Sequence, residues 1–339
     1  MERERVPDAE KLREDRRGIV RSWSLITDED FYHIPVLKDE VLQALRLRPH
    51  GIWVDCTLGG GGHAEAILEA TAPDGLLFGI DRDEEAVRRA GERLKRYGTR
   101  VRLLHEGFKN LGAILKTQGV HGVDGILMDL GISTLQLMDS ERGFSFQKDG
   151  PLDMRMDRGA SLTAAALVNS LSEPQLLQIL FEYGEERWAR RIARTIVHER
   201  EKSPVTRTLQ LADLIRRAIP RVSRAQRIHP ATRTFQALRI AVNQELDQLD
   251  VGLSAAASCL NDGGRLCVIS FHSLEDRIVK RTFKALTRAE PDRVRLITKK
   301  PVVPGPDEIR MNPRSRSAKL RALERMADAP EPDDSETVS

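Results

Sequence analysis

The residues best suited to chemistry are four consecutive glycines, Gly59 to Gly62, and an acid that follows them, Asp81. A short β-prone run, Ile52 to Val54, precedes the glycines, and the pattern after them predicts a helix from Gly62 to Ala70. Glycine lets the backbone approach a ligand closely, and a helix N-terminus presents free N–H groups. Asp81 ends a predicted strand about 20 residues on, where a carboxylate can bind ribose hydroxyls. The pattern predicts a binding edge for a nucleotide-like ligand.

The glycine pattern alone leaves the identity of the ligand open. Gly59-x-Gly61-x-x-Ala64 also fits the dinucleotide fingerprint, so NAD is an alternative ligand. A tight turn without any ligand is a second alternative, which the position of Asp81 disfavours.

Four further residues are candidates for the same edge. Asp129 ends the predicted strand 124–129, where it can accept a hydrogen bond from a ligand amine or simply cap a loop. His63 can touch the ligand or cap its own helix, and Phe108 can stack on an adenine or belong to the core. Gln136, in the loop after Asp129, can hold polar groups of a ligand or face solvent.

The elements that must position these residues alternate between strands and helices. Such alternation gives a parallel sheet with right-handed crossovers, and the ligand site lies at the carboxyl ends of the strands. The predicted strands are 52–54, 76–80, 101–104 and 124–129, and the predicted helices are 36–47, 62–70, 83–96 and 111–118.

The alternation stops near residue 140, and the pattern from 140 to 230 is helical with prolines as punctuation. We therefore predict a doubly wound α/β domain made of residues 33–139 and 231–325, with an all-helical insertion at 140–230. In its second part we expect a helix over 234–260, a turn at 261–264, a strand at 265–271, a helix at 275–286 and closing strands at 294–298 and 319–323.

Length and composition set the class of protein. A chain of 339 residues with 40% hydrophobic residues is long enough for two domains with real cores. We find no apolar run near the roughly 18 residues that span a membrane, no signal-peptide core, and only three cysteines. These features predict a cytoplasmic protein without disulfides or a cysteine metal site. Residues 1–32 and 326–339 are polar and are predicted to be disordered extensions.

The charge is unevenly distributed, although the net charge is only +3. Between Arg187 and Arg239 there are 14 Lys or Arg residues against three acids, which gives this stretch +11. A solvated helical surface usually carries more acids, so the asymmetry favours a polyanion such as RNA. A stripe of Trp188, Ile192 and Ile196 is expected to face the core. The arginines on the other face suit phosphate: Arg187, Arg190, Arg191 and Arg194.

From His33 to about Leu323 the chain resembles the bacterial 16S ribosomal RNA (cytosine-N4) methyltransferases, the MraW or RsmH family. The resemblance rests on several specific motifs: Gly61-Gly-His63, Ile80-Asp-Arg-Asp83, Glu141-Arg-Gly-Phe-Ser-Phe146, Asp149-Gly-Pro-Leu-Asp-Met-Arg-Met156, Tyr183-Gly-Glu-Glu186, His229-Pro-Ala-Thr-Arg-Thr-Phe-Gln236 and Ser270-Phe-His-Ser-Leu-Glu-Asp-Arg277. The chain departs from the pattern at Thr134-Leu135, where relatives commonly have Ser-Pro.

The resemblance implies a class I S-adenosylmethionine-dependent methyltransferase (Rossmann-like) domain with a helical substrate domain inserted. It implies a cytidine in the decoding region of 16S rRNA, at the P site of the small ribosomal subunit, as substrate. No metal is needed, because the methyl group is carried on a sulfonium. The implied cofactor contacts are Gly61, Gly62, His63, Asp81, Phe108, Asp129 and Gln136.

The residues favour transfer to the cytosine amine. Transfer to ring carbon 5 would need a cysteine nucleophile, and no cysteine sits in a loop suited to that role: Cys56 lies in the strand that leads to the glycine loop, Cys267 in a strand and Cys259 in a helix. We expect Asp129 to be the catalytic residue that handles the amine, with His272 as second candidate. For RNA contacts we expect Arg187, Arg191 and Arg194. Two rival hypotheses are an NAD-dependent oxidoreductase, which would not explain the basic insertion, and a non-catalytic RNA-binding assembly factor.

Overall fold

The structure is a computed structural model that describes residues 35–220 and 229–327. The predicted extension at 1–32, and residues 328–339 of the predicted tail, lie outside the described residues. Within the described ranges, no helix is both long and apolar enough to cross a membrane. In the same ranges, no three His, Cys, Asp or Glu side chains gather as metal ligands would.

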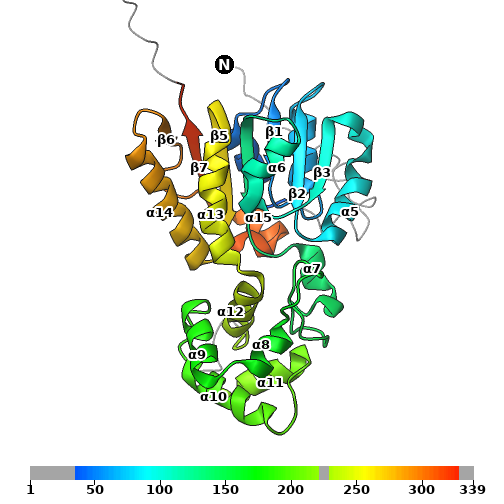
Figure 1. Cartoon of the computed structure of the whole chain (residues 1–339), viewed down its shortest axis with the longest axis vertical. Coiled ribbons are helices and arrows are strands. Elements are labelled where there is room, and N and C mark those ends of the chain that lie inside the picture. The colour runs from blue at the N-terminus through cyan, green and yellow to red at the C-terminus, as the bar shows by residue number, and fades with distance from the viewer. Residues whose placement is uncertain (1–34, 221–228, 328–339) are drawn as a thin grey trace, which may run out of the picture. The chain divides into compact units, whose positions relative to one another are not determined.

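The described residues form a seven-stranded sheet in the order β3-β2-β1-β4-β5-β7-β6, which lies in the upper half of Figure 1. Neighbouring strands from β3 to β5 pair in parallel, and β7 pairs antiparallel with both β5 and β6. The predicted parallel sheet is confirmed. The strands are β1 Ile52–Asp55, β2 Leu76–Asp81, β3 Val101–His105, β4 Val123–Asp129, β5 Leu260–Ser270, β6 Val294–Leu296 and β7 Lys319–Arg325.

Helices cover both faces of this sheet, because successive side chains of its strands point to opposite faces. Trp53 packs into one apolar cluster, and the next residue, Val54, packs into the other. The first cluster includes side chains of α3 Lys38–Leu45, α4 Gly62–Ala70 and α5 Glu84–Leu94; the second includes side chains of α6 Leu111–Thr117, α13 Glu245–Ser258 and α14 Ser273–Ala289. The fold is therefore doubly wound and Rossmann-like, as predicted. Its switch point lies between β1 and β4.

A second core lies among helices that come between β4 and β5 in the chain. It includes Ile192 and Ile196, with Trp188 packed against it, so the apolar stripe predicted for this helix does face a core. The helices are α8 Ala164–Ser170, α9 Glu173–Glu182, α10 Ala189–Arg200, α11 Thr208–Ala218 and α12 Thr232–Asn243. We call these five helices the helical module (Figure 1).

The single helix predicted over 234–260 is wrong. The structure has two helices, α12 and α13, separated at Gln244, whose left-handed backbone (φ 49°, ψ 41°) ends the first. The physical reason is that the two halves serve different cores. Phe235 and Leu238 of α12 pack in the helical module, whereas Leu249 and Leu253 of α13 pack on the sheet. Helix α12 therefore packs with the helices that precede it, and α13 packs on the sheet.

The turn predicted at 261–264 is also wrong, because these residues belong to β5, which begins at Leu260. Leu260 pairs with Val123, and the register with β4 then shifts before Gly125 meets Arg265. Gly263, with a φ of 76°, takes up this irregularity within the strand.

Candidate active site

The carboxylate of Asp81 lies at the end of β2 and holds the glycine turn. Its Oδ2 accepts the N–H of Gly59 at 2.8 Å, and its Oδ1 accepts the N–H of Asp83 at 2.9 Å. Gly59 has a φ of 50°, which favours glycine at this position. A carboxylate has about four acceptor sites, so two backbone bonds leave room for ribose hydroxyls. Burial raises the pKa of Asp81, while the two N–H bonds act in the opposite direction.

His63 follows Gly61 and Gly62 in the first turn of α4 and is buried. Its Nε2 lies 3.6 Å from Oδ2 of Asp129. Burial, together with the charge of Lys38, lowers the pKa of His63 to about 4. The ring is therefore neutral near pH 7, and its contact with Asp129 is not an ion pair. The structure brings these predicted residues together at one edge.

A second buried acid, Asp55, lies at the end of β1 and was missed by the sequence analysis. Thr57 connects it to Asp129: the N–H of Thr57 donates to Oδ1 of Asp55 at 3.1 Å, and the hydroxyl of Thr57 accepts the N–H of Asp129 at 2.6 Å. Burial raises the pKa of Asp55 to about 7. Burial, and then the charges of Asp55 and Glu275, also raise the pKa of Asp129. The sequence did carry a signal for Asp55, because an acid stands shortly before the glycine turn.

Phe108 begins a short turn after β3 and packs against α13. A Cβ added to Gly252 would lie 2.5 Å from Cδ2 of Phe108, so the ring needs a glycine at this point of the helix. Phe108 as a whole is only partly buried. Its packing against α13 and its remaining exposure leave both alternatives for this residue open.

Gln136 is buried, and both polar atoms of its side chain form hydrogen bonds to neighbours. Its Oε1 accepts the N–H of Ser133 at 3.0 Å, and its Nε2 donates to Oδ2 of Asp83 at 2.7 Å. The same Oδ2 accepts Nη1 of Arg142 at 2.8 Å, and both partners of this ion pair are buried. Gln136 therefore shapes the wall beside Asp81, and only one N–H of its amide is without a partner among the described residues.

Arg142 and Asn243 connect this wall to the helical module. Nη2 of Arg142 donates to the carbonyls of Arg155 and Met156 at 3.0 and 2.8 Å. The Oδ1 of Asn243 accepts the N–H of Met156 at 2.8 Å, and its Nδ2 donates to the carbonyl of Met154 at 2.7 Å. The sequence analysis assigned no role to these residues, because the bonds join segments far apart in the chain.

His272 is held by its own helix. It is the N-cap of α14, where its Nδ1 accepts the N–H of Glu275 at 3.4 Å. Its Nε2 lies 3.0 Å from Oε1 of the same glutamate. Nδ1 is thus engaged within its own helix, whereas Nε2 is buried without a hydrogen-bond partner among the described residues, so His272 stays the second candidate for the amine.

The three predicted RNA contacts lie at the exposed surface of the helical module. The guanidinium groups of Arg187 and Arg191 lie 5.3 and 5.8 Å from the ring centroid of Trp188. Arg194 is 72% exposed and lies 3.5 Å from Glu173. Stacking on Trp188 leaves the edges of two guanidinium groups free to meet phosphate.

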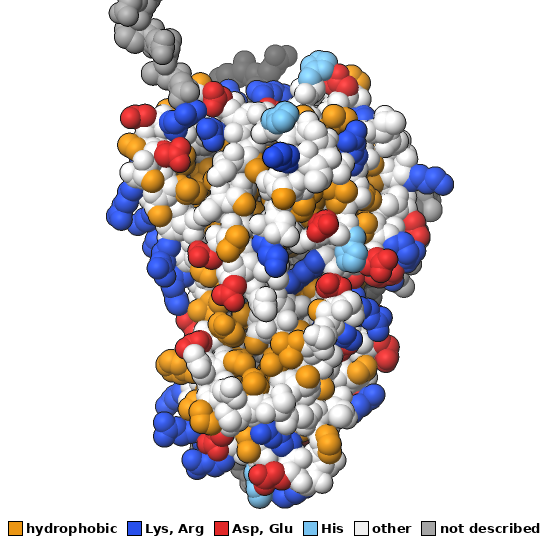
Figure 2. All heavy atoms as spheres, viewed as in Figure 1, with side chains coloured by type: hydrophobic (Ala, Val, Ile, Leu, Met, Phe, Trp, Pro, Cys, Tyr) orange, Lys and Arg blue, Asp and Glu red, His pale blue; other side chains and the backbone are white. Residues whose placement is uncertain are grey.

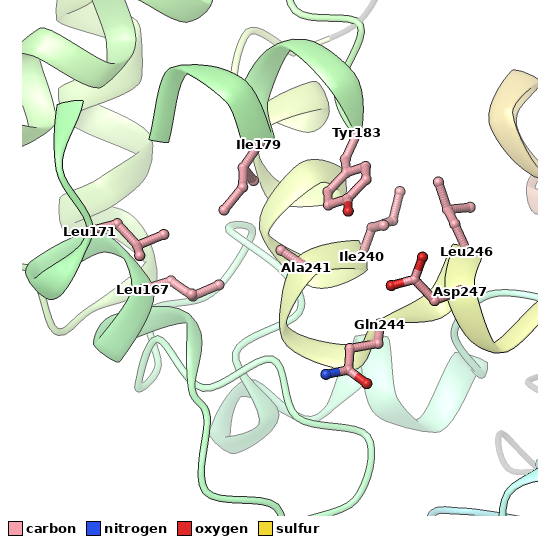
Figure 3. Close-up of a pocket in the computed structure, with 9 residues that line it drawn as sticks. All are labelled: Leu167, Leu171, Ile179, Tyr183, Ile240, Ala241, Gln244, Leu246 and Asp247. Atoms are coloured by element: carbon pink, nitrogen blue, oxygen red, sulfur yellow. The ribbon is translucent and has the colours of Figure 1, made fainter. Parts of the chain in front are cut away.

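A pocket of about 270 Å³ lies where α8 and α9 meet α12 and α13 (Figure 3). Figure 3 shows Leu167 and Leu171 on one side of it, and Tyr183 with Asp247 on the other. Burial, followed by the charge of Asp247, raises the pKa of Tyr183. None of the predicted site residues lines this pocket, which is separate from the edge described above.

The polar atoms at the carboxyl edge fit a cationic nucleoside. Asp55 Oδ2, Asp129 Oδ1 and both ring nitrogens of His63 are buried without a hydrogen-bond partner among the described residues. Such atoms are costly unless a ligand satisfies them. Two buried carboxyls favour a positive charge, Asp81 can bind a diol, and Phe108 can flank a base. This arrangement fits the sulfonium, ribose and adenine of S-adenosylmethionine.

Comparisons with known proteins find similar chains. The chain is 54% identical over 311 residues to Ribosomal RNA small subunit methyltransferase H of Citrifermentans bemidjiense, covering 88% of this chain and 100% of that protein. It is 55% identical to the protein of the same name from Geobacter sulfurreducens, over 87% of this chain and 99% of that one. A crystal structure described as that of a "putative rRNA-methylase" from Clostridium thermocellum shares 11% identity, with a TM-score of 0.43, over 87% of this chain and 100% of that chain.

The family model described as the MraW methylase family matches residues 30–326, which is most of the chain. The cofactor is S-adenosylmethionine, and the chain belongs to the MraW methylase family.

Proposed function

We propose that the protein transfers a methyl group from S-adenosylmethionine to the exocyclic N4 amine of a cytidine in the decoding region of 16S rRNA, at the P site. The relatives named above support ribosomal RNA of the small subunit as substrate. The observation that carries the proposal is the group of buried, unpartnered carboxyl and imidazole atoms at the ends of β1 and β4.

The chain's own residues have three tasks at this edge. Asp81 and the glycine turn hold the nucleoside part of the cofactor, and Asp55 with Asp129 faces its positive charge. The bound cofactor supplies a methyl group that is already electrophilic. The cytosine amine is a weak nucleophile because it is conjugated with the ring, so its alignment matters most. Asp129 orients this amine or accepts its proton.

The state of the three cysteine thiols supports an amine, rather than a ring carbon, as the acceptor of the methyl group. Burial raises the pKa of Cys56 and of Cys267, the latter to about 12, so neither is a ready thiolate. Cys259 lies at the end of α13, and burial raises its pKa as well. A nucleophilic cysteine would need a lowered pKa at an exposed position.

The direct test is to map modified nucleosides of 16S rRNA with and without the gene, and to measure labelled methyl transfer in vitro. We expect loss of one N4-methylated cytidine in the decoding region, restored by the wild-type gene. Absence of transfer to any ribosomal RNA would favour the rival non-catalytic assembly factor. A methyl group found on another atom or base would overturn the proposed acceptor.

Replacing Asp81 should weaken cofactor binding. Hydrogen bonds to a charged group contribute roughly 1.5–3 kcal/mol, so Asp81→Ala should raise the dissociation constant of S-adenosylmethionine about ten- to a hundredfold. Titration calorimetry measures this change. Asp74→Ala, an exposed acid before the opposite end of β2, is the matched control and should bind normally. Unchanged affinity in Asp81→Ala would remove this residue from the cofactor site.

Replacing Arg187, Arg191 and Arg194 with Ala should flatten the salt dependence of RNA binding. Each lost phosphate contact should reduce the slope of log affinity against log salt by about 0.7–0.9. Filter binding of a 16S rRNA fragment across a salt series measures the slope. The triple Lys variant retains the charges and should retain the slope, and cofactor affinity should not change in either variant. An identical slope in the Ala variant would mean that this face does not meet RNA.

A further inference from the structure

Helix α14 presents a row of positive charges on its outer face. Its inner face packs on the sheet through Leu274, Val279 and Phe283, which are buried. The outward, exposed side chains include five cations: Arg277, Lys280, Arg281, Lys284 and Arg288. The two acids of this helix, Glu275 and Asp276, point elsewhere, because Glu275 is buried and Asp276 bonds to Arg321 of β7.

These cations lie on one side of the helix because of their spacing. Arg277, Arg281, Lys284 and Arg288 follow one another at intervals of four, three and four residues, which places them on one stripe. Eleven residues of helix extend about 16 Å. Figure 2 shows Lys and Arg side chains along the left edge of the molecule, which is where Figure 1 places α14.

An ordinary solvated helix in the same protein looks different. On α5, Glu85 forms ion pairs with Arg88 and Arg89, and Arg88 also pairs with Glu92. On α14, Arg277 has an acidic partner, Glu185. The other four cations have no acidic partner among the described residues. Four neighbouring cations without local neutralisation repel one another, so this face is suited to an external anion.

The row begins beside the predicted RNA-binding face of the helical module. The Nη2 of Arg277 donates to Oε1 of Glu185 at 2.9 Å, and the hydroxyl of Ser273 donates to Oε2 of the same residue at 2.7 Å. Glu185 is two residues from Arg187, which stacks on Trp188. Since α14 starts at the carboxyl end of β5, the row also begins at the edge that carries the candidate site.

We infer that the outer face of α14 binds the phosphate backbone of the RNA strand flanking the target nucleotide, so that RNA contacts extend onto the sheet domain. The inference rests on the proposed function for the identity of the polyanion. Lysine and arginine side chains without neighbouring aromatic or amide groups bind phosphate without reading bases. This surface therefore contributes affinity and orientation, and it does not choose the base.

The test is a quadruple variant, Lys280→Ala, Arg281→Ala, Lys284→Ala and Arg288→Ala, which leaves Arg277 and its contact with Glu185 intact. The slope of log affinity against log salt for a 16S rRNA fragment should fall by about 3 if all four contact phosphate. The KM for RNA should rise at physiological salt, while kcat and cofactor affinity stay unchanged. Exchanging the two lysines for arginine should keep the slope, and removing Arg88 and Arg89 from α5 should leave it unchanged.

Each outcome decides the inference separately from the proposed function. An unchanged slope together with normal methylation of the expected cytidine overturns the inference alone. A reduced slope with methyl transfer to a different acceptor supports this surface and overturns the proposed acceptor. Normal binding to naked RNA, with activity lost only on the assembled subunit, would assign the face to an acidic protein and overturn the inference.

Discussion

Asp129→Asn should lower the rate of methyl transfer by about 10²–10⁴ at saturating cofactor and RNA, which is the usual size of a general-base effect. The change keeps the shape of the side chain but removes its charge and most of its basicity. Affinity for both substrates should change much less than the rate. Single-turnover transfer of labelled methyl, measured at saturation, separates the two effects.

The surroundings of Asp129 give the reason for this expectation. Its Oδ1 is buried without a hydrogen-bond partner among the described residues, although the side chain as a whole is 24% exposed. Its neighbour His63 is neutral and does not compensate its charge. A carboxyl in this position can approach a substrate amine from the open side and receive a proton from it.

The pH dependence of the single-turnover rate should report the ionisation of Asp129. Burial, with the charges of Asp55 and Glu275, raises the pKa of Asp129 well above its usual range. Below that raised pKa the carboxyl is protonated and cannot accept a proton. The wild-type single-turnover rate should therefore rise with pH until Asp129 is ionised, whereas the Asn variant should lack this rise.

The matched control is Asp124→Asn, at the opposite end of the same strand. Asp124 accepts hydrogen bonds from Arg48 and from the N–H of Ile52, and it lies away from the ligand edge. The Asp124→Asn substitution should leave the rate of methyl transfer at saturating cofactor and RNA unchanged. A near-normal rate in Asp129→Asn, reached only with more cofactor, would make Asp129 a binding residue. Asp55 and His272 would then be the next groups to test.

The glycine turn and Asp81 could be predicted from sequence because their signal is local. A β-prone run, a glycine turn and a helix follow each other directly, and the acid ends the next strand, so spacing alone locates them. Asp55 escaped notice because its burial and its unpartnered oxygen depend on packing around β1. The break at Gln244 also escaped notice, since both sides of it have a helical pattern and only the two separate cores require it.

The pairing of Asp83 with Arg142 could not be predicted for a similar reason. The two residues are 59 positions apart, and nothing in either local pattern marks them as partners. Asp83 begins α5 as its N-cap, with Oδ1 accepting the N–H of Glu85, and offers Oδ2 to Gln136 and Arg142. Only the folded chain shows that one carboxylate joins the cofactor edge to the helical module.

Arg142→Ala should strongly destabilise the protein, with a loss of about 3–5 kcal/mol in the free energy of unfolding. Both partners are buried, with side chains 6% and 4% exposed, so removal of Arg142 leaves the Asp83 carboxylate without its cation. The two carbonyls that Arg142 holds, on Arg155 and Met156, also lose a donor. Urea unfolding followed by circular dichroism measures the loss.

Two controls test whether the buried charge is the cause. Arg88→Ala removes two exposed ion pairs, with Glu85 and Glu92, and should leave the free energy of unfolding nearly unchanged. Combining Arg142→Met with Asp83→Asn removes both charges, so the double variant should lose less than the two single variants together. Because the N–H of Asp83 donates to Asp81, saturating S-adenosylmethionine should restore part of the lost stability. Strict additivity in the double variant would show that packing, not the charge pair, holds this wall in place.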